Sequence, residues 1–200
     1  MRSRPPTDFF VAAGALGRRK TLRTIAYGAA LIAAGLSSAA SAMTVTSSDI
    51  KPGGKIADEQ VANLFGCTSP NVSPALSWSG APKGTKSFAI SMYDPDAPTG
   101  SGFWHWWVVN IPPDVTSLPK GAGGGTGMPA GAMQGRNDFS TTSYGGPCPP
   151  PGKPHRYIIT VYALGVDKLD VDQNASPAVI GFNANAHALA KATLTGLYGR

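Results

Sequence analysis

Four side chains in this sequence have the chemistry of a functional site, and each stands at the end of an apolar run that is typical of a β-strand. Asp94 and Asp96 supply carboxylates, and His105 and His155 supply imidazoles. Strand ends are where a rigid scaffold presents functional groups. Two imidazoles with one or two carboxylates can hold a metal ion, bind an anion, or transfer protons.

The spacing of Asp94 and Asp96 allows two interpretations. Pro95 pushes the residue before it out of helical geometry, so an extended backbone would point both carboxylates the same way. Alternatively, the two carboxylates cap a turn by accepting hydrogen bonds from backbone N–H groups. Both interpretations stay open on the sequence.

The two histidines also have structural alternatives. His105 follows Trp104 and precedes Trp106, so it is also typical of a packed core histidine held by one hydrogen bond. His155 precedes Arg156, a pattern that fits a surface pair at the start of a strand.

The sequence motifs of several classes of catalytic site are absent from this chain. The chain contains no H-x-x-x-H or H-E-x-x-H pair for a metal and no Gly-x-Ser-x-Gly nucleophile elbow. The glycine-rich run at residues 121–125 is not followed by Lys-Ser or Lys-Thr, as a phosphate loop would be. We therefore expect no catalytic residue, no metal and no cofactor. A hydrolase or metal-dependent enzyme is the weakest of the functional hypotheses.

The elements that must position these side chains are mainly strands. The pattern predicts a hairpin in residues 44–57 that turns at 52–54, a helix over 177–189 that begins after Ser176, and a long Gly/Pro-rich loop over 112–153. Further strands are predicted at residues 76–78, 87–93, 105–111, 156–164 and 192–198. Period two places His105, Trp107, Val109 and Ile111 on one face of their strand, and His155, Tyr157, Ile159, Val161 and Ala163 on one face of theirs. The order predicts a mostly antiparallel β fold with little helix.

Residues 1–42 are expected to be a cleavable signal peptide. A basic region at residues 18–23 precedes an apolar run at 25–36 and the Ala40-Ser41-Ala42 cleavage signal. Arg18-Arg19 also resembles a twin-arginine export signal. The remaining residues 43–200 are expected to form one domain in the periplasm or outside the cell.

Charge argues against nucleic-acid binding. The whole chain has 17 basic and 11 acidic side chains and a formal charge of +6. Six of the basic groups and one of the acidic groups lie in residues 1–42, which leaves 11 and 10 in the expected domain. Its net charge is therefore close to zero, and the lysines are scattered along the chain rather than clustered on one segment.

The two cysteines, Cys67 and Cys148, are a disulfide candidate in an oxidising compartment. A loop of roughly 80 residues would stabilise the fold by about 4.5 kcal/mol in the chain-entropy model. Two separate thiols are the alternative.

Four blocks of sequence resemble the phosphatidylethanolamine-binding protein (Raf kinase inhibitor protein-like) family, and its bacterial branch in particular. In chain order they are residues 71–76 (Asn-Val-Ser-Pro-Ala-Leu), 93–98 (Tyr-Asp-Pro-Asp-Ala-Pro), 104–110, and 145–157 with its Gly-Gly-Pro and His-Arg-Tyr. The resemblance covers residues 44–198. It implies two antiparallel sheets, one large and central and one smaller, with few short helices.

The resemblance also implies a pocket for phosphate, phosphoethanolamine or phospholipid head groups. Its ligand-binding residues would be Asp94, Asp96, His105, His155, Tyr157, Gly146 and Pro147, with the two imidazoles protonated to hold the anion. The function implied is non-catalytic binding of small anionic ligands by a monomer or homodimer. The alternative is a protein-interaction or enzyme-inhibitor module that docks through the pocket and the Gly/Pro-rich loop 121–153.

Overall fold

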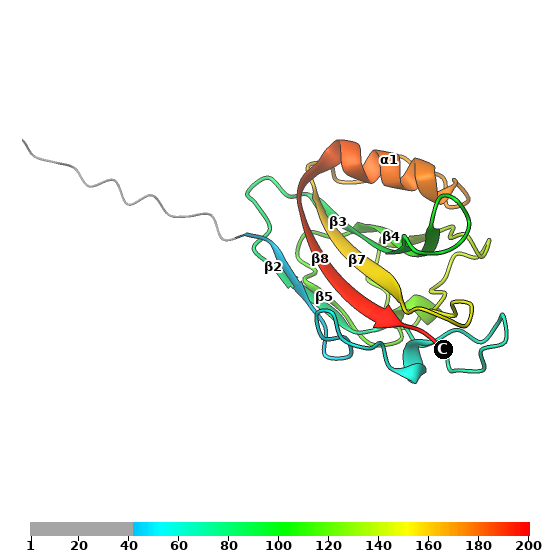
Figure 1. Cartoon of the computed structure of the whole chain (residues 1–200). Coiled ribbons are helices and arrows are strands. Elements are labelled where there is room, and N and C mark those ends of the chain that lie inside the picture. Colours follow the sequence, from blue (N-terminus) through cyan, green and yellow to red (C-terminus); the bar gives the residue numbers. More distant parts are fainter. Residues whose placement is uncertain (1–41) are drawn as a thin grey trace, which may run out of the picture. The chain divides into compact units, whose positions relative to one another are not determined.

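The computed structural model describes residues 42–200 (Figure 1). The expected signal peptide, apart from Ala42, lies outside these residues and stays a prediction. In the described part, no helix is both long and apolar enough to cross a membrane.

Two antiparallel sheets make up the fold, as predicted. The large sheet has the order β6 (Met133–Gly135), β4 (Phe103–Ile111), β3 (Ser87–Asp94), β7 (His155–Leu164) and β8 (Ala188–Tyr198). The small sheet has the order β1 (Thr44–Thr46), β2 (Leu76–Ser79) and β5 (Ser117–Leu118). The one α-helix among the described residues is α1 (Pro177–His187), with two short 3-10 helices at Asp58–Gln60 and Ala122–Gly124.

The large sheet is covered on both faces, which explains why its middle strands are apolar on both sides. Figure 1 shows α1 on one side of this sheet and the small sheet on the other. One buried cluster joins Trp106 and Ile159 of the large sheet to Leu76 of the small sheet. A second cluster joins Trp107 of the large sheet to Ile180 of α1. Strands buried on both faces cannot show a simple alternation of apolar and polar residues.

A β-bulge changes the direction of His105. Met92 and Tyr93 are neighbours on β3, but their partners on β4, Trp106 and Trp104, are two residues apart. His105 is the extra residue between those partners. A bulge of this kind re-aims a side chain relative to the regular alternation of the strand.

The alternation expected for β4 is therefore wrong in part. The ring of His105 contacts Tyr157, which belongs to the core between the two sheets. A second register shift, next to Asn110 with its φ of 60°, brings Ile111 into that same core. Trp107 and Val109 pack on the other face, under α1. The expectation for β7 is confirmed from Tyr157 to Ala163, whose residues at period two all belong to the core between the sheets.

The hairpin predicted for residues 44–57 does not form. β1 pairs with β2, and the segment that follows lies against β8 instead, where Gly53 N donates to Thr195 O at 2.8 Å and Ile56 N donates to Leu197 O at 2.8 Å. Ile56 is fully buried against Gly196, where a Cβ would come within 2.6 Å of its side chain. Burial of this apolar side chain on β8 decided the pairing.

The C-terminal elements follow the prediction with shifted boundaries. The side chain of Ser176 caps α1 by accepting from Val179 N at 3.3 Å. The helix ends at His187, and β8 begins directly after it at Ala188, four residues before the predicted strand. Contact with β7 along this whole length extends the strand beyond its local sequence pattern.

Candidate functional site

A pocket of about 310 Å³ lies where three neighbouring strands of the large sheet meet the loops. The end of β3 and the beginnings of β4 and β7 come together there because these strands are antiparallel neighbours. Four polar residues from these strands line the pocket, and we call them the floor: Asp94, His105, His155 and Tyr157. A second group comes from loops and the end of the chain, and we call it the mouth: Phe65, Cys148, Pro149, Pro150, Pro151 and Arg200.

Asp94 connects the floor to the turn that follows β3. Its side chain is almost fully buried, and Oδ2 accepts a hydrogen bond of 2.8 Å from His155 Nδ1. The other oxygen, Oδ1, accepts from Asp96 N at 2.8 Å, so the carboxylate also caps the turn. Asp94 therefore caps the turn, as one of the two interpretations predicted, and it also lines the pocket.

His155 is oriented by this bond. Because Nδ1–H donates to the carboxylate, Nε2 is the ring nitrogen that remains for a ligand. The side chain is 14% exposed, so it reaches the pocket while its bond to Asp94 is shielded from water. A carboxylate paired with an imidazole in this way fixes both the tautomer and the ring direction.

His105 is held by Gly145 at two points. Nδ1 of the ring donates to Gly145 O at 2.8 Å, and Gly145 N donates to His105 O at 3.0 Å. A Cβ on Gly145 would lie 2.3 Å from the ring of Phe139, so only glycine allows this ring to pack over the clamp. The Nε2 atom of His105 is again the nitrogen that remains for a ligand.

The charge state of His105 depends mainly on its burial. Burial lowers the pKa of His105, and the Gly145 carbonyl and the charge of Asp94 oppose this only in part. The lowered pKa favours the neutral ring near pH 7, in which Nε2 acts as an acceptor rather than as a cationic donor. Burial, followed by the nearby Asp94 charge, raises the pKa of Tyr157, so its hydroxyl stays protonated.

Asp96 has a different partner from Asp94. Its carboxylate accepts from Arg156 Nε at 2.9 Å, from Arg156 Nη2 at 2.7 Å and from Arg156 N at 2.9 Å. The hydrogen bond from the guanidinium is the largest cause that lowers the pKa of Asp96 to about 2. Residues 95–99 form a turn, so the expectation of an extended segment with two parallel carboxylates is wrong. Asp96 is not among the residues that line the pocket.

Gly146 and Pro147 are not among the residues that line the pocket. Gly146 N donates to Asn71 Oδ1 at 2.8 Å, and Pro147 O accepts from Ala62 N at 3.0 Å. A Cβ on Gly146 would lie 2.0 Å from Gln60 O. Only glycine at position 146 therefore allows its backbone to lie this close to the backbone of residues 60–62. The structure gives both residues a supporting position, and their contact with a ligand stays a prediction.

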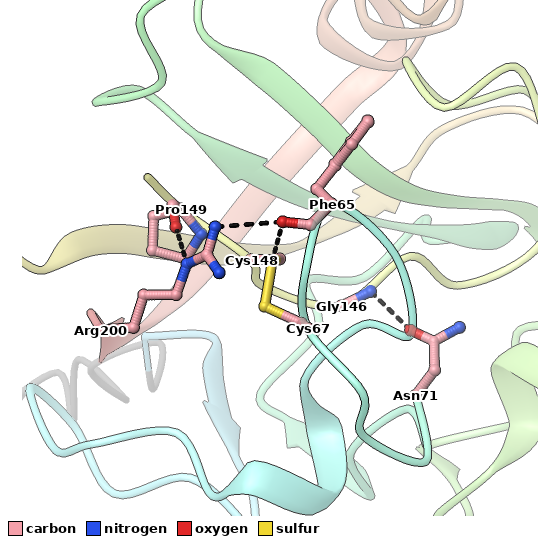
Figure 2. Close-up of a disulfide and its surroundings, with 7 residues drawn as sticks. All are labelled: Phe65, Cys67, Asn71, Gly146, Cys148, Pro149 and Arg200. Carbon is pink, nitrogen blue, oxygen red and sulfur yellow. Dashed lines mark hydrogen bonds between the residues drawn. A yellow bond between two sulfur atoms is a disulfide. The ribbon is translucent and has the colours of Figure 1, made fainter. Parts of the chain in front are cut away.

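The mouth is tied together by a disulfide. Cys67 and Cys148 are bonded, with their Cα atoms 6.1 Å apart, and the bond joins the Phe65 loop to the Pro149 segment (Figure 2). Arg200 connects the same two segments, since Nε donates to Pro149 O at 2.7 Å and Nη2 donates to Phe65 O at 3.1 Å. Phe65 has a φ of 54°, a left-handed conformation that is uncommon for a bulky side chain.

Aromatic rings form much of the remaining wall. Phe103 and Phe139 pack edge to face with centroids 4.7 Å apart, and His105 and Tyr157 do so at 5.1 Å. Sequence reasoning did not identify Phe65, Phe139 or Arg200, because neither their spacing nor their neighbours carry a signal for a pocket.

The arrangement suits reversible binding of a small polar group. The floor offers two imidazole nitrogens, a phenol and a buried carboxylate, and most of the residues around them in the mouth and walls are apolar. Within residues 42–200, no group of three or more His, Cys, Asp or Glu side chains is placed to hold a metal ion.

Comparisons with known proteins identify a family and individual proteins with a similar sequence. The family model for phosphatidylethanolamine-binding proteins matches residues 46–199. The Escherichia coli protein YbcL is 53% identical over 165 residues, which cover 81% of this chain and 90% of YbcL. The Escherichia coli protein YbhB is 49% identical over 157 residues, which cover 78% of this chain and 99% of YbhB.

Solved structures show the same fold. The crystal structure of Escherichia coli YbcL, described as a new member of the mammalian PEBP family, has a TM-score of 0.78 and 52% identity, and the match covers 80% of this chain and 99% of YbcL. A phosphatidylethanolamine-binding protein homologue from Chlamydia trachomatis has a TM-score of 0.67 and 31% identity, over 80% of this chain and 98% of that one.

Proposed function

This chain belongs to the phosphatidylethanolamine-binding protein family, and from that premise we propose that its pocket binds small phosphorylated or otherwise anionic ligands, phospholipid head groups included, without catalysing a reaction. Membership confirms the resemblance seen in the four sequence blocks. The ligand and the absence of catalysis are part of the proposal.

The observation that carries the proposal is the orientation of the two histidines. The bonds from His155 Nδ1 to Asp94 and from His105 Nδ1 to Gly145 O leave both Nε2 atoms for a ligand. A phosphate monoester near neutral pH exchanges a proton with its surroundings, since its second pKa is about 6. It can therefore donate a P–O–H to one imidazole and accept from a donor on the other side.

Two features of the pocket support binding rather than catalysis. The cysteine in its lining, Cys148, is bonded to Cys67 and is therefore no nucleophile. Thr99 and Tyr157 supply the lining hydroxyls, and the hydroxyl of Thr99 donates to Gly102 O at 2.5 Å. Neither hydroxyl is hydrogen-bonded to a histidine as an activated nucleophile would be.

The proposal includes export to the periplasm or beyond. The disulfide supports it, because such bonds persist in oxidising compartments and are rare in a reducing cytosol.

Calorimetric titration with inorganic phosphate and with phosphoethanolamine tests the function. We expect the unaltered protein to bind both ligands and His155→Ala to lose binding, because the variant removes the proposed ligand contact at Nε2 and the hydrogen bond to Asp94 Oδ2. His187→Ala, at the exposed end of α1, is the matched control and should bind as the unaltered protein does.

The comparison of the two ligands separates a phosphate site from a head-group site. Equal affinities would show that the phosphate carries the recognition, and tighter binding of phosphoethanolamine would show that the amine contributes. If the unaltered protein binds neither ligand, the proposal is wrong, and the interaction-module alternative would be the one to pursue.

A further inference from the structure

Arg200 occupies an unusual position at the mouth of the pocket. Its guanidinium donates to two backbone carbonyls, Pro149 O at 2.7 Å and Phe65 O at 3.1 Å, which belong to the two segments joined by the disulfide (Figure 2). Gly66 lies directly beside it, where a Cβ would come within 3.3 Å of Nη1. The plane of the guanidinium is therefore fixed although the residue itself is exposed.

Most of the hydrogen-bonding capacity of Arg200 is unused. A guanidinium has five N–H donors in a rigid fork, and two of its nitrogens, Nε and Nη2, each make one bond here. Among residues 42–200, Nη1 has no acceptor, and the salt bridges formed in that part of the chain use other basic groups. Arg200 thus forms no ion pair within 4.0 Å with a side-chain carboxylate of the described chain.

The charges on the floor do not by themselves favour an anion. Asp94 is buried and its carboxylate lies against the ring of His155, so an acidic group faces the floor beside that imidazole. His105 is neutral near pH 7, because burial lowers its pKa. Among the residues that line the pocket, Arg200 is the one with a permanent positive charge.

We propose that Arg200 binds the anionic group of the ligand directly and sets the preference of the pocket for anions over neutral molecules of similar shape. The inference deepens the proposed function and rests on it. The two carbonyl bonds hold the guanidinium in one orientation at the pocket lining, and a planar fork of this kind matches two oxygens of a phosphate or carboxylate. The competing interpretation is that Arg200 only braces the Phe65 loop against the Pro149 segment.

Three variants distinguish these roles in titrations with inorganic phosphate. We expect Arg200→Gln to weaken binding about tenfold at low salt, and Arg200→Lys to recover part of that loss because it restores the charge without the fork. Lys153→Gln is the matched control, since Lys153 is an exposed cation of the same region that does not line the pocket. It should change the affinity less than about twofold.

Salt dependence separates a charge contact from a brace. When the titrations are repeated between about 20 and 500 mM salt, the affinity of the unaltered protein for inorganic phosphate should fall as the salt concentration rises. The difference in affinity between the unaltered protein and Arg200→Gln should become smaller as screening increases. Thermal unfolding of each variant without ligand records any loss of the bracing bonds independently.

The results of these titrations distinguish the proposed function of the pocket from the proposed role of Arg200. No phosphate binding by the unaltered protein would overturn the proposed function and this inference together. Binding that survives Arg200→Gln, or that is lost equally at every salt concentration and is not recovered by Arg200→Lys, would overturn the role of Arg200 and leave the proposed function standing.

Discussion

The floor and the mouth of the pocket are built by different physical means. The floor residues stand on β3, β4 and β7, whose backbones are paired along most of their lengths and whose side chains enter the buried core. The mouth residues stand on loops, and Phe65 is 69% exposed. A disulfide and the two hydrogen bonds of Arg200 hold the mouth together, whereas the floor is held by the strand pairing of the large sheet.

This difference has an energetic consequence. Local opening of a protein begins where buried contacts are few, so the mouth should open at a lower free energy than the floor, which opens only with the whole sheet. A site of this kind keeps its polar groups in fixed directions, while the segments that admit the ligand stay adjustable.

Removal of the disulfide tests the mouth with the largest expected effect. The bond joins cysteines 81 positions apart, so Cys67→Ser with Cys148→Ser should lower the free energy of unfolding by about 4.5 kcal/mol in the chain-entropy model, or somewhat less in practice. Urea unfolding measures this, and a reductant should lower the stability of the unaltered protein equally. A loss below about 1 kcal/mol would show that non-covalent contacts already hold the mouth closed.

Asp94→Asn tests the floor. An amide has only one oxygen, so either the Nδ1–H of His155 or the N–H of Asp96 would face an NH2 group, and we expect a loss of about 2 kcal/mol in unfolding free energy. Asp96→Asn is the matched control, and should cost about 0.5 kcal/mol because its pair with Arg156 is partly exposed. Similar losses in the two variants would contradict the distinction drawn between these carboxylates.

The neutral state of His105 predicts a pH dependence of stability. The unfolded chain takes up a proton at this histidine below about pH 6.5, while burial lowers the pKa in the folded protein. The contribution of the neutral His105 to the free energy of unfolding is therefore complete above about pH 6.5. It is lost as the pH falls towards the lowered pKa, by at most about 1.4 kcal/mol per pH unit.

Urea unfolding between pH 7 and about 5 measures this, with His105→Gln as the uncharged comparison. The variant should lose less stability over the range than the unaltered protein does. Parallel curves would show that the folded protein accepts the proton on His105 as readily as the unfolded chain.

Phe65→Ala should have the smallest effect on stability and test the mouth alone. Because the ring is largely exposed, the free energy of unfolding should change by less than about 0.5 kcal/mol. Its loss from the pocket wall should weaken binding of phosphoethanolamine about threefold, and binding of inorganic phosphate less, because only the former has carbon atoms to contact. Calorimetric titration of both ligands measures the difference, and a large drop in stability would contradict the view of this loop as adjustable.

Much of the floor could be predicted from local sequence. Asp94, His105 and His155 each end or begin a strand with a clear apolar pattern, and the strands themselves form where that pattern predicts. The motif order also predicted the family and the two-sheet fold. Of the two interpretations left open for Asp96, the turn is the one observed after β3, and the face predicted for His105 was wrong, because a bulge shifts β4.

The sequence by itself therefore determined the strands β2, β3, β4 and β7 and most of β8, the helix start at Ser176, the polar residues at the strand ends and the family. It did not predict β5 and β6, which lie in the segment 112–153 expected to be a loop. Only the tertiary structure decided which carboxylate enters the pocket, that His105 is neutral, and that Phe65, Phe139 and Arg200 complete the walls. The physical reason is that strand patterns and caps arise from neighbours in the chain, whereas burial, register shifts and loop contacts join residues far apart. Arg200 and Phe65 are 135 positions apart, and no local pattern records their contact.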